Sequence, residues 1–154
     1  MRLFGRTLLA AAGLALAAVV FQTWSSAAAT GPATVRITDK QTRFSSVDIG
    51  PRGRSSGDIE VAYSLVYNRR ITQRPLGHAE FLCTYTIGLN RSCRGTILLP
   101  QGRLEVGGIL RYRQFYVLAV IGGTGLYDNA RGALTVTRIG RNPPRQLLFF
   151  RLTG

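Results

Sequence analysis

The chain has 154 residues and a formal net charge of +13, which comes from 20 basic and 7 acidic residues. Its length fits one globular domain behind a leader segment. The arginines attract polyanions, but no aromatic residues accompany them in a stacking pattern, so a nucleic-acid partner is not expected. One histidine and two cysteines leave no convincing metal site.

Residues 1–29 have the layout of a secretory signal peptide. Arg2 and Arg6 precede an apolar run from Leu8 to Phe21, and the small residues Ala27–Ala29 supply a cleavage site. The alternative is an uncleaved membrane anchor, but the apolar run is shorter than the ~20 residues that a spanning helix needs. We therefore expect a secreted protein with no transmembrane segment after cleavage.

The remainder, residues 30–154, is expected to form one all-β domain. After a short strand at Val35–Ile37 and a loop at Asp48–Gly57, short β-branched and aromatic runs alternate with Gly, Asn and Pro. The expected strands are Ile59–Tyr67, Leu76–Thr86, Cys93–Leu99, Arg103–Gly108, Tyr112–Ile121, Ala133–Ile139 and Gln146–Leu152. Seven or eight antiparallel strands form either a sandwich or a barrel.

The two cysteines are expected to pair. Cys83 and Cys93 flank a turn near Gly88, and a hairpin folded there places them opposite each other. In an exported chain an isolated pair predicts a disulfide, whereas the alternative is two reduced, buried thiols.

A glycine-dense segment is the most specific motif of the chain. The run LAVIGGTGLY at Leu118–Tyr127 is followed by NARGA at Asn129–Ala133, and PLGHAEFLC at Pro75–Cys83 and GRLEVGG at Gly102–Gly108 precede it. In this order the segments resemble the allene oxide cyclase and dirigent barrel superfamily. The resemblance implies a single eight-stranded antiparallel β-barrel, calycin-like, with an apolar lumen. Members of the family cyclise an unstable lipid epoxide or guide radical coupling without a redox centre, often as dimers or trimers.

The resemblance does not extend to the catalytic residues of the plant cyclases. The family's first-strand Glu and Asn fall on Arg36 and Thr38, a second Asn falls on Ser64, and its Tyr falls on Leu110. The lumen cysteine of the family falls on Cys83, which is expected to be in a disulfide. True allene oxide cyclase activity is therefore not expected, although these positions still predict a ligand-binding lumen.

Strand alternation adds further lumen residues. If Cys83 faces inward, so does Phe81, and if Ser64 faces inward, so does Glu60. A buried Glu60 has the chemistry of a general acid or base, but paired with Arg36 it forms a structural ion pair instead.

Tyr112 is the second catalytic candidate, since it shares a strand face with Leu110. It either donates a hydrogen bond to a substrate oxygen or is an ordinary core tyrosine.

The glycine motif itself is expected to be structural. Gly122, Gly123 and Gly125 lack the following Lys-Ser/Thr and helix that a phosphate loop needs, so we expect a turn that Arg131 anchors through backbone carbonyls.

Taken together, the sequence predicts a secreted barrel that binds a small hydrophobic molecule in its lumen. The barrel is expected to direct the cyclisation, isomerisation or stereochemistry of this ligand with no cofactor and no metal. The alternative is a non-enzymatic barrel that carries a ligand or binds an anionic surface through its arginines.

Overall fold

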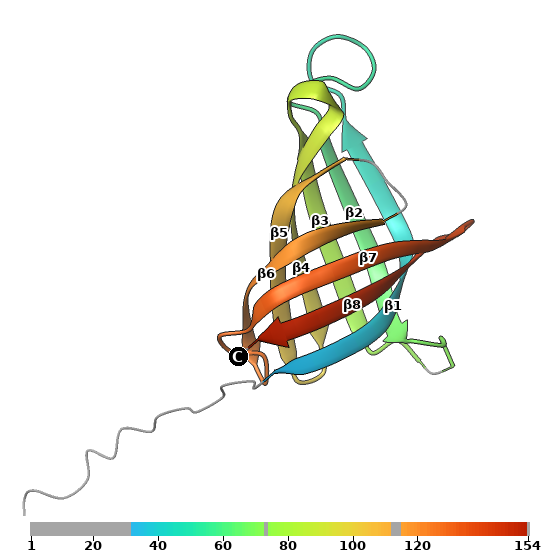
Figure 1. Ribbon diagram of the computed structural model, residues 1–154. Coiled ribbons are helices and arrows are strands. Elements are labelled where there is room, and N and C mark those ends of the chain that lie inside the picture. Colours follow the sequence, from blue (N-terminus) through green and yellow to red (C-terminus); the bar gives the residue numbers. More distant parts are fainter. Residues whose placement is uncertain (1–31, 73, 112–114, 154) are drawn as a thin grey trace, which may run out of the picture.

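Eight antiparallel strands form a closed barrel in the computed structural model, which describes residues 32–72, 74–111 and 115–153 (Figure 1). Each strand pairs with its neighbour in the sequence, and the last strand pairs with the first. The strands are β1 (Ala33–Val47), β2 (Ile59–Asn68), β3 (Gly77–Tyr85), β4 (Asn90–Leu99), β5 (Gly102–Arg111), β6 (Phe115–Gly125), β7 (Arg131–Arg141) and β8 (Pro144–Thr153). A 3-10 turn, Ile87–Leu89, connects β3 to β4. The all-β barrel expected from the sequence is therefore confirmed.

One end of the barrel is a dry core. In Figure 1 this is the lower end, marked by the β4–β5 turn and the C-terminus. Alternate residues of every strand point inward here and are almost fully buried, and they are Ile37, Val66, Ala79, Ile97, Leu104, Val106, Leu118, Val120, Leu134, Val136, Leu148 and Phe150. Burial of one such aliphatic or aromatic side chain stabilises the fold by roughly 1.5–3 kcal/mol.

The glycine motif closes this end, although it lies differently from the expectation. Gly122 and Gly123 belong to β6, which continues as far as Gly125, and the turn itself follows at residues 126–130. Gly125 adopts a φ of 65°, a conformation that favours glycine. Arg131 donates a hydrogen bond of 3.0 Å to the carbonyl oxygen of Ala130, which is the kind of anchor that the sequence predicted.

The first strand is much longer than the expected Val35–Ile37. It pairs with β8 only as far as Lys40, opposite Arg145, and stays with β2 through Val47. A register shift between Gln41 and Arg43 marks the point where the partners diverge. Beyond Lys40, β1 therefore pairs with β2 and no longer with β8.

No helix in the described ranges is long and apolar enough to cross a membrane.

Candidate functional site

The upper half of the barrel contains a cavity of about 840 Å³. It lies where β2, β4, β6 and β8 begin and where β3, β5 and β7 end, so every strand contributes to its wall. The polar part of the wall consists of Asp39, Gln41, Arg54, Glu60, Ser64, Arg91, Tyr116, Arg138, Arg141 and Gln146. The apolar part includes Phe44, Phe81, Leu110, Ile139 and the two cysteines.

Asp39 is the buried acid of the cavity, with only 3% of its surface exposed. Burial raises its pKa to about 6, an effect that hydrogen bonds from Ser64 and from the backbone of Gln146 offset in part. Its Oδ1 atom has no hydrogen-bond partner among the described residues. A carboxyl group that is half ionised near pH 6 is suited to both accepting and donating a proton.

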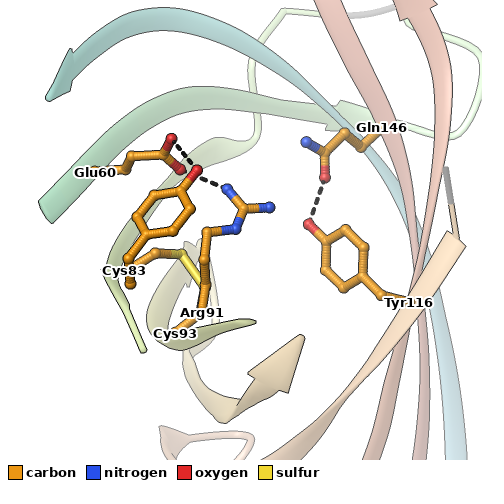
Figure 2. Close-up of polar contacts among 7 residues, drawn as sticks. Glu60, Cys83, Arg91, Cys93, Tyr116 and Gln146 are labelled. Carbon is orange, nitrogen blue, oxygen red and sulfur yellow. Dashed lines mark hydrogen bonds and ion pairs between the residues drawn. A yellow bond between two sulfur atoms is a disulfide. The ribbon is translucent and has the colours of Figure 1, made fainter. Parts of the chain in front are cut away.

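Tyr116 provides a neutral hydroxyl beside this acid. Its Oη donates a hydrogen bond of 3.1 Å to Oε1 of Gln146, as Figure 2 shows. Burial raises the pKa of Tyr116 to about 12, and the negative charge of Asp39 contributes to the shift. The phenol therefore stays protonated at physiological pH, and its one proton is donated to Gln146.

A second polar cluster surrounds Glu60 on the opposite side of the cavity (Figure 2). Tyr85 donates a hydrogen bond of 2.8 Å to Oε1, and Arg91 donates one of 2.5 Å to Oε2. The side chains of Glu60 and Arg91 are only 13% and 12% exposed. Because both carboxylate oxygens are engaged, Glu60 is held as an ion pair, and the partner is Arg91 instead of Arg36.

The predicted disulfide is present and fixes this cluster. Cys83 lies opposite Cys93 and is bonded to it. Two residues further along the same two strands, Tyr85 lies opposite Arg91. On the neighbouring strand β2, Glu60 lies opposite Cys83. The covalent bond therefore holds together the two strands that supply both partners of Glu60.

Several predicted lumen residues lie in the cavity wall. Ser64 and Leu110 are buried there, Phe81 is partly buried, and Glu60 lines the wall as described above. Their part in ligand binding stays a prediction. Tyr112 lies outside the described residues.

The prediction for the first strand is wrong by one residue. Arg36 is exposed, and its guanidinium lies 4.6 Å from the ring centroid of Phe149 on the outer face. Thr38 is buried, but its hydroxyl donates a hydrogen bond of 2.9 Å to the carbonyl oxygen of Arg69, and it does not line the cavity. Since alternate residues face the lumen, the inward positions are Ile37 and Asp39.

No protein-family model and no curated protein sequence matches the chain. Solved structures do match. Pyocyanin demethylase is 22% identical, with a TM-score of 0.68 over 79% of this chain and 100% of that chain. The Diels–Alderase AbmU from Streptomyces koyangensis is 14% identical, with a TM-score of 0.62 over 77% of this chain and 64% of that chain. The pterocarpan synthase dirigent protein PsPTS1 is 12% identical, with a TM-score of 0.59 over 81% of this chain and 97% of that chain.

These matches show the fold. The protein shares its closed eight-stranded barrel fold with these structures, which is the fold that the resemblance of its glycine motifs implied. The barrel is one that cyclases, Diels–Alderases and dirigent proteins share, and those proteins act on small molecules.

Proposed function

We propose that the protein binds a small, mainly apolar organic molecule in its cavity and catalyses a cyclisation or isomerisation of it, with Asp39 as the acid and base. The observation that carries this proposal is the buried carboxyl of Asp39 in the wall of a cavity of about 840 Å³. A buried carboxyl without a full set of partners destabilises a fold, so its presence is better explained by chemistry than by stability.

The proposed mechanism uses two groups of the cavity. Asp39, with a pKa of about 6, removes a proton from a carbon next to a carbonyl group and returns it at another atom. Tyr116, which remains neutral, releases its hydrogen bond to Gln146 and donates instead to the oxygen on which negative charge develops. The apolar walls at Phe81 and Leu110 hold the carbon skeleton in the reactive conformer, which lowers the entropic part of the barrier.

Two further observations support small-molecule chemistry outside the cytoplasm. The structural neighbours are named as a demethylase, a Diels–Alderase and a pterocarpan synthase, all of which are activities on small molecules. The Cys83–Cys93 disulfide suits an oxidising compartment, which agrees with export.

The test makes use of the fact that cyclisation and isomerisation do not change the mass of the substrate. The purified protein is incubated with a metabolite extract of the organism that makes it, and the mixture is analysed by chromatography and mass spectrometry. We expect one compound to disappear and a new peak of the same mass to appear. In D₂O the product should carry one deuterium, because Asp39 exchanges its proton with solvent before returning it.

The matched control is a second acid-to-amide change. Asp39→Asn should slow the conversion by about 100-fold or more, the usual contribution of a general acid or base. Asp128→Asn, in the turn beyond β6 and outside the cavity, should leave the rate unchanged. An unchanged extract, or equal rates with and without Asp39, would exclude the proposed function.

A further inference from the structure

The cavity wall has more cationic than acidic side chains. Four guanidinium groups line it, and only two carboxyl groups do. One of the carboxyl groups, that of Glu60, is engaged with Arg91. An excess of positive charge around a cavity favours a negatively charged ligand.

Among the arginines of the cavity wall, Arg138 is the one that strand pairing connects to Asp39. It lies opposite Gln146 on the neighbouring strand, and Gln146 lies opposite Asp39 on the strand after that. All three side chains line the cavity. Neighbouring strands are about 4.8 Å apart, so the backbones at Arg138 and Asp39 are roughly 10 Å apart across this row.

Tyr116 connects the two ends of the row. Its hydroxyl donates to Gln146, the central residue. Its pKa is raised by burial and by the charge of Asp39, and it is lowered by the charges of Arg91 and Arg138. A cation, a neutral hydrogen-bond donor and an acid therefore face the same space.

The other arginines are less suited to anchor a ligand. Arg91 belongs to the Glu60 cluster on the opposite side of the cavity (Figure 2), while Arg54 and Arg141 are exposed, so salt in the solvent screens them. Arg138 is partly buried, and β7 shifts its register directly after it, between Arg138 and Gly140. Such shifts frequently re-aim side chains next to functional sites.

We infer that the cavity selects small organic anions, with a carboxylate or phenolate of the ligand bound by Arg138 and the apolar body lying against Phe81 and Leu110. The inference deepens the proposed function, because the anionic group on Arg138 places the rest of the molecule beside Asp39. The preference for an anion is a property of binding alone, and it can be measured without turnover.

The experiment compares two probes of the same shape and different charge. The dissociation constants of 2-naphthoate and of the neutral 2-naphthalenemethanol are measured by calorimetry at pH 7 and physiological salt. We expect the anion to bind at least tenfold more tightly than the alcohol. Equal affinities, or no binding of either probe, would overturn the inference.

Variants assign the preference to one side chain. Arg138→Gln should weaken naphthoate binding at least tenfold and leave the alcohol unchanged, so the alcohol also reports that the cavity has folded. If Arg138→Gln binds neither probe, Arg138→Lys decides: retained preference for the anion supports the inference, and equal affinities overturn it. Arg151→Gln, on the exposed outer face of β8, is the control. An equal loss in this control would mean that the net surface charge, and no particular arginine, attracts the anion.

The failures of the two proposals are distinguishable. Asp39→Asn should keep the preference for naphthoate, because it removes no positive charge. A protein that prefers the anion but converts nothing in the extract disproves catalysis and retains the anion site. A protein that converts a compound but binds both probes equally disproves the anion site and retains catalysis.

Discussion

The burial of Asp39 couples the stability of the barrel to pH. In the native state its pKa is about 6, whereas an exposed aspartate has a value of 3.8. The native state therefore holds a proton that the unfolded chain releases, and stability falls as the pH rises from about 4 to about 6. A shift of roughly two pKa units corresponds to about 3 kcal/mol at neutral pH.

Asp39→Asn should therefore stabilise the protein at neutral pH. We expect a gain of up to about 3 kcal/mol at pH 7.5 and almost none at pH 4, where the aspartate is protonated in both states. Chemical denaturation of the wild type and the variant across this range measures the difference. If the free energies of unfolding of the two proteins changed with pH in parallel, the pKa of Asp39 would not be raised in the native state.

Glu60 and Arg91 give a contrasting case, because there two buried charges compensate each other. Glu60→Gln removes the carboxylate from the guanidinium and should destabilise the fold by about 2 kcal/mol. The double variant Glu60→Leu, Arg91→Met removes both charges and should recover at least half of that loss, since an apolar pair can replace a buried ion pair. Unfolding of Glu60→Leu, of Arg91→Met and of the double variant gives the coupling energy. Additive effects would contradict a structural ion pair.

The residue-scale predictions from sequence failed where strand phase was uncertain. The sequence has Val35 and Ile37 at alternate positions, and continuing that alternation leads to Asp39. Alignment with the family's catalytic Glu and Asn led instead to Arg36 and Thr38, one residue out of phase. Glu60 was placed correctly, but its partner Arg91 comes from a strand whose start the sequence did not mark.

At the scale of elements, the strands were predicted best where turns fix their ends. The β3–β4 hairpin folds around Gly88, and this placed Cys83 opposite Cys93. By contrast, β1 continues through Gln41 and Arg43, polar residues that do not have the pattern of a strand. This segment is nevertheless a strand because it pairs with β2 and partly lines a polar cavity. Both are tertiary interactions that the local residue pattern does not show.

The glycine motif of β6 is required by close backbone packing, and two adjacent glycines test this. A Cβ atom at Gly123 would overlap the carbonyl oxygens of Tyr127 and Arg103, whereas at Gly122 its nearest neighbour is the Arg131 guanidinium at 3.8 Å. Gly123→Ala should therefore destabilise the barrel by about 2 kcal/mol or more, and Gly122→Ala should change its stability by less than about 1 kcal/mol. Thermal unfolding of both variants measures this, and equal effects would contradict the packing argument.

For the whole molecule, the barrel divides its interior into an apolar half and a polar half. The lower half buries aliphatic residues completely, and the upper half encloses ionisable groups around open space. The order of the glycine motifs predicted the closed barrel through their resemblance to a barrel superfamily. It did not predict the polar character of the cavity, which was expected to be apolar, since that depends on which of several arginines point inward.

This division predicts two classes of backbone amides in hydrogen exchange. Amides beside the dry core, such as those of Leu104 and Leu134, should exchange only through global unfolding, because each is held by pairing on buried strands. Amides around the cavity, such as those of Gln41 and Ile139, lie at register shifts and should exchange through local opening. Saturation with 2-naphthoate should slow the cavity class and leave the core class unchanged relative to global stability. Uniform exchange along all eight strands, or protection of the core alone, would show that the ligand does not occupy the upper half of the barrel.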